Sequence, residues 1–206
     1  WVVPEADWRA GPRGVRLRAA ARGPLGTTTW RGVPTASRER MAFDLAARCD
    51  LELAVARLDV VVRAGLLDLA AFRAWLLDRH DDDVVAVRAA ADQCDPRAES
   101  IPESKLRVRL RRAGFDVEPQ VDVFHGGRFV GRVDLALERL RIAVEYEGRW
   151  RTVVEGQLND DHLRREALSQ AGWKVVVITA ERMRLRGDAE DAVRRAVAER
   201  AEEGLV

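Results

Sequence analysis

The sequence lacks a basic excess, a long apolar run and any cluster of cysteines. Its 35 Lys and Arg residues face 34 Asp and Glu, so the global electrostatic footprint of a nucleic-acid-binding protein is absent. No stretch approaches the roughly 20 apolar residues that span a bilayer, so no membrane segment is predicted. Cys49 and Cys94 do not have the spacing of a metal site, so a reduced, cytoplasmic location is expected.

What is present is an ordinary globular composition with unevenly placed charge. With 47% hydrophobic and 33% charged residues, the 206-residue chain has room for one large or two small domains. Acidic residues gather around positions 78–83 and 186–203. Basic residues gather within eight positions, at Lys105, Arg107, Arg109, Arg111 and Arg112. The distribution of charge is therefore more informative than its sum.

The first half predicts an irregular segment followed by a small helical domain. Glycine and proline punctuate short apolar runs in residues 1–33, which is typical of brief strands and turns. Apolar residues then recur at helical spacing, and we expect four helices in about the next sixty residues. Near the third of them, His80 and Asp81–Asp83 suggest either a metal site or an exposed charged helix end, and we expect the exposed end.

The second half predicts the order helix, strand, strand, strand, helix, strand, helix. Gly126-Gly127 joins the first two strands and indicates a hairpin. The expected fold class is α/β (α+β), a mixed sheet flanked by helices whose last strand joins through a helical crossover, preceded by the small helical domain. We expect the domains to cover residues 1–97 and 98–206.

Three carboxylates are placed to converge on this sheet. Asp134 lies in the middle of an apolar strand, and Glu145 and Glu147 lie two apart on the next, so both point to one face. Carboxylates brought together repel, and burying them is costly unless they are paired or bind a metal. Mg²⁺ prefers such oxygen ligands. The alternative is that Asp134 pairs with a nearby arginine and that Glu145 lies on a solvated face.

Glu103 has two interpretations as well. Ser100-Ile101-Pro102-Glu103 is a capping-box pattern, in which the Glu103 carboxylate would reach back to the Ser100 amide. From spacing alone, capping is the favoured role. The arginine-rich face of the same helix, Arg107 included, is either a solvated surface or a DNA contact.

Five motifs in matching order carry a resemblance to a known family. The C-terminal half resembles the very-short-patch-repair-like (Vsr-like) branch of the PD-(D/E)xK restriction-endonuclease-like superfamily over about eighty residues. The motifs are Ser-Ile-Pro-Glu-Ser-Lys-Leu-Arg (100–107), Val-Asp-Leu-Ala (133–136), Ala-Val-Glu-Tyr-Glu-Gly (143–148), Asp161 with Arg164, and Gly-Trp-Lys-Val-Val-Val-Ile-Thr (172–179). The implied fold is a restriction-endonuclease-like core.

The preceding region carries a second resemblance. Residues 33–46 are similar to the middle segment of actinobacterial chains that have an antitoxin-like region before the nuclease-like domain. Residues 1–97 are therefore expected to be a partial antitoxin-like region. Such chains usually begin with a winged-helix DNA-binding module, most or all of which is expected to be absent here.

The resemblance implies roles for particular residues. By matching position, Glu103, Asp134 and Glu145 are the metal-site acids, with Mg²⁺ (or Mn²⁺) as the cofactor. Glu147 is implied to be a further ligand or a water-orienting group. Arg164, with Asp161, is implied to support the site or touch phosphate, and both roles of Glu103 can hold together because a helix N-terminus favours anionic groups.

The sequence departs from the family pattern at two positions. Glu147 stands where the superfamily has lysine, and Arg151 stands where relatives commonly have histidine. Arginine cannot act as a base in proteins, although it can stabilise charge on a phosphoryl group. His162 could replace the missing imidazole, but a surface histidine is expected. Trp150 is either a base-stacking residue or a core aromatic.

Three candidate functions follow from these residues. The first is a Mg²⁺-dependent DNA endonuclease, with mismatched, nicked or distorted duplex as its candidate substrate. The second is a catalytically degenerate DNA-binding or antitoxin-like regulatory protein, for which Arg151 near phosphate would be useful but Asp134 and Glu145 would not. RNA cleavage, or a protein-interaction role for the helical domain, is a third. The oligomeric state is left open.

Overall fold

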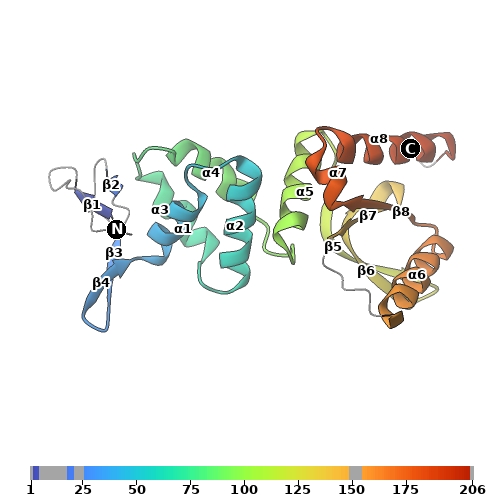
Figure 1. Ribbon diagram of the computed structural model, residues 1–206, viewed down its shortest axis with the longest axis horizontal. Helices are drawn as coiled ribbons and strands as arrows, with labels where there is room; N and C mark the ends of the chain where they lie inside the picture. The colour runs from blue at the N-terminus through green and yellow to red at the C-terminus, as the bar shows by residue number, and fades with distance from the viewer. Residues whose placement is uncertain (1, 5–17, 21–25, 149–154, 205–206) are drawn as a thin grey trace. The chain divides into compact units, whose positions relative to one another are not determined.

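The computed structural model describes residues 2–4, 18–20, 26–148 and 155–204, and the side chains of 26–148 and 162–204. The chain divides into two compact units, Trp1–Pro96 and Arg97–Val206. The mixed α/β class expected from the sequence is confirmed, with a helical region followed by a mixed four-stranded sheet and flanking helices (Figure 1). No helix in the described part of the chain is long and apolar enough to cross a membrane.

The described residues of the first unit form two small strand pairs and four helices. Strands β1 (Val2–Pro4) and β2 (Arg18–Ala20) pair in parallel, and β3 (Thr27–Trp30) and β4 (Val33–Ala36) form a hairpin. The helices are α1 (Arg38–Ala46), α2 (Leu51–Arg63), α3 (Leu69–Leu77) and α4 (Val84–Asp92). The side chains of Ser37, Asp50 and Asp68 cap the first three helices at the positions where small polar residues satisfy free N–H groups.

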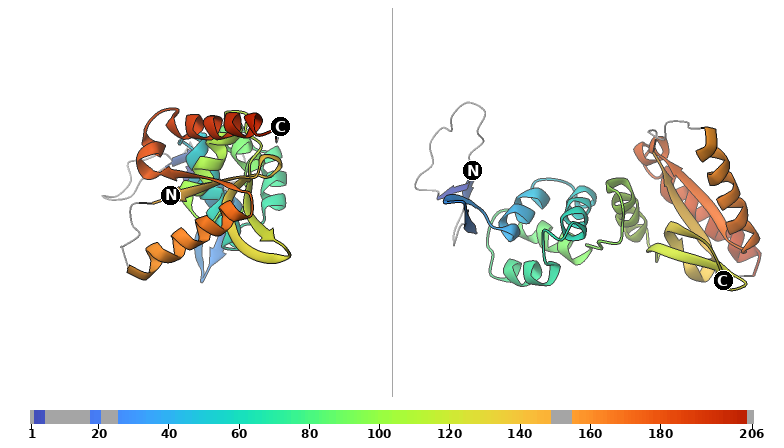
Figure 2. Two further views of the ribbon diagram at one scale, coloured as in Figure 1. Left: turned by 90° about the vertical axis from the view of Figure 1, so that its right-hand side faces the viewer. Right: turned by 90° about the horizontal axis from the view of Figure 1, so that it is seen from below.

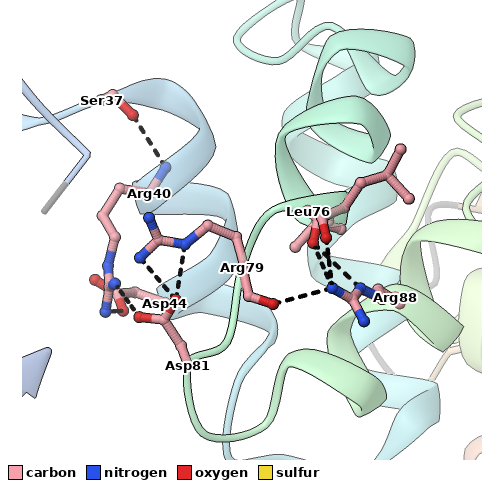
Figure 3. Close-up of polar contacts among 8 residues, drawn as sticks. Ser37, Arg40, Asp44, Leu76, Arg79, Asp81 and Arg88 are labelled. Atoms are coloured by element: carbon pink, nitrogen blue, oxygen red, sulfur yellow. Dashed lines mark hydrogen bonds and ion pairs between the residues drawn. The ribbon is translucent and has the colours of Figure 1, made fainter. Parts of the chain in front are cut away.

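A buried ion-pair network links α1 to the segment between α3 and α4. Asp81 accepts hydrogen bonds from Arg40 Nη1 at 2.9 Å and from Arg79 Nε at 2.7 Å, and Arg40 also pairs with Asp44 (Figure 3). Arg40, Arg79 and Asp81 are each at most 7% exposed. The expected exposed helix end is therefore wrong for Asp81, although it holds for its neighbour His80.

The second unit is a sheet with helices on both faces. It comprises α5 (Ile101–Arg112), β5 (Glu118–His125), β6 (Arg128–Leu137), the 3-10 turn η2 (Glu138–Leu140), β7 (Ile142–Glu147), α6 (Glu155–Gln170), β8 (Lys174–Thr179), α7 (Ala180–Arg184) and α8 (Asp188–Glu202). The strand order is β5-β6-β7-β8, antiparallel except for the parallel pair β7 and β8. The predicted helical crossover into the last strand is thus confirmed.

Each face of the sheet has its own core. On one face the strands pack against α5 and α8 through residues such as Leu106, Leu135, Ile142 and Val193, all fully buried. On the other face Val133 and Ala143 pack against Leu168 of α6, and Figure 2 shows α6 and α8 on opposite sides of the sheet. The alternation of residues along β7 therefore sends Ala143, Glu145 and Glu147 toward α6.

Local chemistry explains the hairpin and the end of the first helix. Gly126 and Gly127 both have positive φ, at 56° and 78°, as the tight turn between two twisted strands requires. Gly114, with φ of 90°, follows α5 in the left-handed conformation that ends many helices. One helix, α7, was not expected, because five residues are too few to show a helical period.

Candidate active site

Asp134 and Glu145 lie at neighbouring positions on adjacent strands. Leu135 pairs with Val144 in the β6–β7 ladder, and the next step along both strands brings Asp134 opposite Glu145. The regular pairing ends there, and Asp134 Oδ2 instead accepts a hydrogen bond of 2.9 Å from the main-chain N–H of Tyr146. A side chain thus replaces a main-chain partner, which fixes this carboxylate where the two strands part.

Glu145 is a buried carboxylate faced by arginines from α6. The residue is 4% exposed. Arg164 Nη2 donates to its Oε2 at 2.9 Å, and Arg164 Nη1 lies 2.7 Å from Oε1. Arg165 Nε lies 3.8 Å from Oε2. Within the described residues no hydrogen bond of acceptable angle reaches Oε1, so this oxygen has unused acceptor capacity.

Glu147 lies at the outer edge of the same group. Arg165 Nη2 donates to its Oε2 at 3.2 Å, and 42% of its side chain is exposed. It shares a face of β7 with Glu145, as the alternation in the sequence predicted. Arg165 therefore bridges the buried and the exposed carboxylate.

Glu103 is fixed at the start of α5. Its carboxylate accepts hydrogen bonds from the Ser100 hydroxyl at 2.6 Å and from the Glu99 N–H at 2.9 Å, and Ser100 Oγ accepts from the Glu103 N–H. The capping arrangement is confirmed, but the amide reached is that of Glu99 rather than the expected Ser100. Gln120 Nε2 on β5 donates a third bond to Glu103, at 3.0 Å.

Burial and the neighbouring charged groups change the pKa of Asp134. Its pKa is raised from 3.8 to about 6. Burial is the largest cause and the negative charge of Glu103 the next, while Glu145 contributes less. The Tyr146 N–H and the Arg164 guanidinium act in the opposite direction. Asp134 is therefore coupled electrostatically to both of the other predicted metal-site acids.

A small polar cavity lies among these groups. Its volume is about 30 Å³, and it is lined by Asp134, Glu145, Tyr146, Glu147, Arg164 and Arg165. That volume admits one water molecule or one ion. Its lining combines three carboxylates, which are the kind of ligand that a hard divalent cation prefers, with two arginines that carry the opposite charge.

The geometry does not present a finished metal site. Among the described residues, no three His, Cys, Asp or Glu side chains are placed to hold a metal ion together. Arg164 now supplies the positive charge beside Glu145, and Glu103 is engaged by its three hydrogen bonds. The structure thus brings Asp134, Glu145 and Glu147 to one cavity, with Glu103 joined to the group through Gln120 and through its charge.

The predicted DNA-contacting residues fall into three groups. Arg164 lies in the site, where its Nη1 also donates to the Arg132 carbonyl oxygen at 3.1 Å. Arg107 is fully buried, so the expectation that it contacts DNA is wrong for this arrangement: a side chain packed in the interior cannot reach a phosphate. Trp150 and Arg151 lie outside the described residues.

Two residues of the site were missed by sequence reasoning. Arg165 follows Arg164 directly in the sequence, and this adjacency is the signal that marks it. Gln120 carries no such signal, because no sequence pattern predicts a positive φ for a non-glycine residue within a strand. His162, the candidate replacement imidazole, has an exposed side chain.

Comparisons with known proteins show a distant, partial similarity. No model of a known protein family matches the chain. No solved structure matches it. The uncharacterized proteins Rv2248 and MT2308, from two strains of Mycobacterium tuberculosis, are each 31% identical to it over 102 residues. The matched segment covers 49% of this chain and 38% of each relative.

Proposed function

We propose that the unit Arg97–Val206 is a metal-dependent DNA endonuclease domain, related to the Vsr-like branch of the PD-(D/E)xK superfamily. The observation that carries this is the convergence of Asp134, Glu145 and Glu147 on one cavity of about 30 Å³. Two buried or half-buried carboxylates at neighbouring positions repel each other, which costs stability where arginines do not offset the repulsion. A divalent cation removes that cost.

The ligands of this cation would be Asp134 and Glu145. Glu147, at the open edge of the cavity, would hold or orient a water molecule, and Glu103 would add negative charge from α5. Bound there, Mg²⁺ or Mn²⁺ supplies a Lewis acid that polarises a phosphodiester and lowers the pKa of an attacking water. Asp134 is held ready for this role by its bond from Tyr146.

Arg164 would pair with Glu145 when no metal is bound and with a phosphate when a metal is bound. It pairs with Glu145 in this structure, with 30% of its side chain exposed. A cation beside Glu145 would compete with the guanidinium for the same carboxylate and leave Arg164 able to contact a phosphate, which suits its planar, forked donors. Metal binding and DNA binding would therefore support one another.

A second candidate is a catalytically degenerate DNA-binding or antitoxin-like regulatory protein. The specific observation in its favour is that Arg164 and Arg165 already neutralise Glu145 and Glu147. A site compensated by arginines is stable without metal. The acid at Glu147, where the superfamily has lysine, agrees with this alternative.

The two candidates separate in a cleavage assay. Supercoiled and mismatch-containing DNA is incubated with the purified chain in Mg²⁺, Mn²⁺ or EDTA, alongside D134N and the control D122N at an exposed aspartate of β5. Metal-dependent nicking by the unaltered protein and by D122N, but not by D134N, supports the endonuclease. Nicking that survives in D134N contradicts the assigned site. DNA binding without any cleavage favours the regulatory candidate.

A further inference from the structure

Gln120 occupies a conformation that its strand does not explain. In the β5–β6 ladder Pro119 pairs with Leu135 and Val121 with Val133, so Gln120 lies opposite Asp134. Its φ is +56°, in the left-handed region, within a strand whose neighbours pair on both sides. A residue with a Cβ adopts this conformation at a cost in free energy, because the Cβ lies close to the following carbonyl oxygen. Such residues are found where surrounding contacts fix them, often at functional sites.

The side chain of Gln120 shows what fixes it. Its amide Nε2 donates to Glu103 Oε2 at 3.0 Å, across from β5 to the first turn of α5. The other bonds to this carboxylate, from Ser100 and Glu99, come from the helix start itself. The Gln120 bond is thus the described contact that ties Glu103 to the sheet on which Asp134 lies.

The position of Gln120 follows from the same register. Gln120, Asp134 and Glu145 occupy matching positions on three successive strands, β5, β6 and β7. Gln120, with its left-handed backbone conformation, is therefore one strand away from Asp134, whose pKa the negative charge of Glu103 raises. A bond that only stabilised the start of α5 would not need to originate at this row.

We propose that Gln120 is a positioning residue that holds the Glu103 carboxylate toward Asp134 and Glu145 through its side-chain amide. This inference rests on the proposed metal-dependent function. Groups that hydrogen-bond a metal-site carboxylate orient it, and their loss typically lowers metal affinity or activity by about 10-fold to 100-fold. Gln120 would act through Glu103 and not on DNA or metal directly.

Two variants distinguish the role of the Gln120 side-chain amide from that of its backbone conformation. Q120M keeps the length of the side chain and the strained φ but removes the donor. Q120G also removes the donor and relieves the strain, because glycine adopts positive φ freely. If the amide positions Glu103, both variants bind Mn²⁺ about tenfold more weakly, as measured from the free Mn²⁺ signal by electron paramagnetic resonance. If only the backbone conformation matters, the two variants differ from each other.

A double-mutant cycle tests whether Gln120 acts through Glu103. In an E103Q background, Q120M should change Mn²⁺ affinity by less than about twofold, because coupled residues are not additive. Mn²⁺ affinity in Q120M and Q120G equal to that of the unaltered protein, or full additivity with E103Q, overturns the inference and leaves the proposed function standing. Failure of the unaltered protein to bind Mn²⁺ overturns both. Thermal unfolding of each variant tests whether the fold is retained.

Discussion

The main-chain N–H of Tyr146 donates a hydrogen bond to the Asp134 carboxylate at the point where β6 and β7 separate. The bond stabilises the ionised form of Asp134, yet burial and the charge of Glu103 outweigh it and raise the pKa to about 6. Asp134 is therefore held in place in a setting that disfavours its own charge. Such a carboxylate destabilises the folded protein, and a cation bound beside it would offset this cost.

This setting predicts a pH-dependent stability. A carboxyl whose pKa is higher in the folded than in the unfolded state favours folding below pH 3.8, and that contribution is lost as pH rises through about 6. A rise from 3.8 to about 6 corresponds to roughly 3 kcal/mol as an upper figure. In EDTA, D134N should therefore be more stable than the unaltered protein at pH 8, with the difference vanishing near pH 4.

Urea unfolding at several pH values measures this difference. The asparagine keeps an oxygen that can accept the Tyr146 bond, so the comparison reports the charge. D122N removes one negative charge from an exposed site on the next strand and serves as the control. A D134N variant that is less stable than the unaltered protein at pH 8 would show that the carboxylate is not penalised by burial.

Arg164 should be exchangeable with metal. R164Q removes the ion pair of a largely buried Glu145 and is expected to lower the free energy of unfolding by about 1–3 kcal/mol, below the range for fully buried pairs because Arg164 is 30% exposed. Mg²⁺ should restore part of this loss, since a ligand that binds only the folded state stabilises it. R164Q should also bind Mn²⁺ more tightly than the unaltered protein.

Thermal unfolding of R164Q with EDTA or with Mg²⁺ provides the measurement. R132Q is the control, because Arg132 is exposed and its carboxylate partners lie at 3.8 Å, so its effect should stay within about 0.5 kcal/mol. A melting temperature of R164Q that Mg²⁺ does not change would argue against a cation at Glu145.

The two glutamates of β7 should differ in their effects on cleavage. Both line the cavity, but Glu145 is 4% exposed, whereas 42% of the Glu147 side chain is exposed. E145Q is therefore expected to reduce nicking to the EDTA background, while E147Q leaves measurable activity, lowered about 10-fold to 100-fold. Initial nicking rates of the two variants decide this, and equal rates would remove the distinction between a ligand and an edge residue.

The sequence was sufficient for features that depend on local chemistry. The alternation in 141–147 predicted the shared face of Glu145 and Glu147, and Gly126-Gly127 predicted the hairpin. The pattern from Ser100 to Glu103 predicted the helix start. Each of these depends on neighbours within a few residues, so the pattern and the physical cause lie in the same stretch.

Features that depend on distant contacts were not predictable. Arg107 lies in a basic stretch that is typical of a solvated helix face, yet it is buried. The pairing of Arg164 with Glu145 depends on how α6 crosses β7, which no spacing in one strand or helix specifies. Gln120 adopts a positive φ beside a partner 17 positions away, Glu103. Tertiary contacts override local preference at these positions.

Asp81 provides a test of the first unit. D81N would remove the buried carboxylate that Arg40 and Arg79 share, both of them 4% exposed, and would leave Arg40 its ion pair with Asp44; breaking a buried ion pair on one side is costly. We expect a loss of about 3–5 kcal/mol, confined to the unit Trp1–Pro96. Asp82 is exposed, so D82N is the matched control and should change stability by less than about 0.5 kcal/mol.

Urea unfolding followed by tryptophan fluorescence should detect the loss, because Trp75 packs on Phe72 and Arg79 in this unit. Equal stability of D81N and D82N would mean that partners other than Asp81, such as Asp44 beside Arg40, compensate the two arginines.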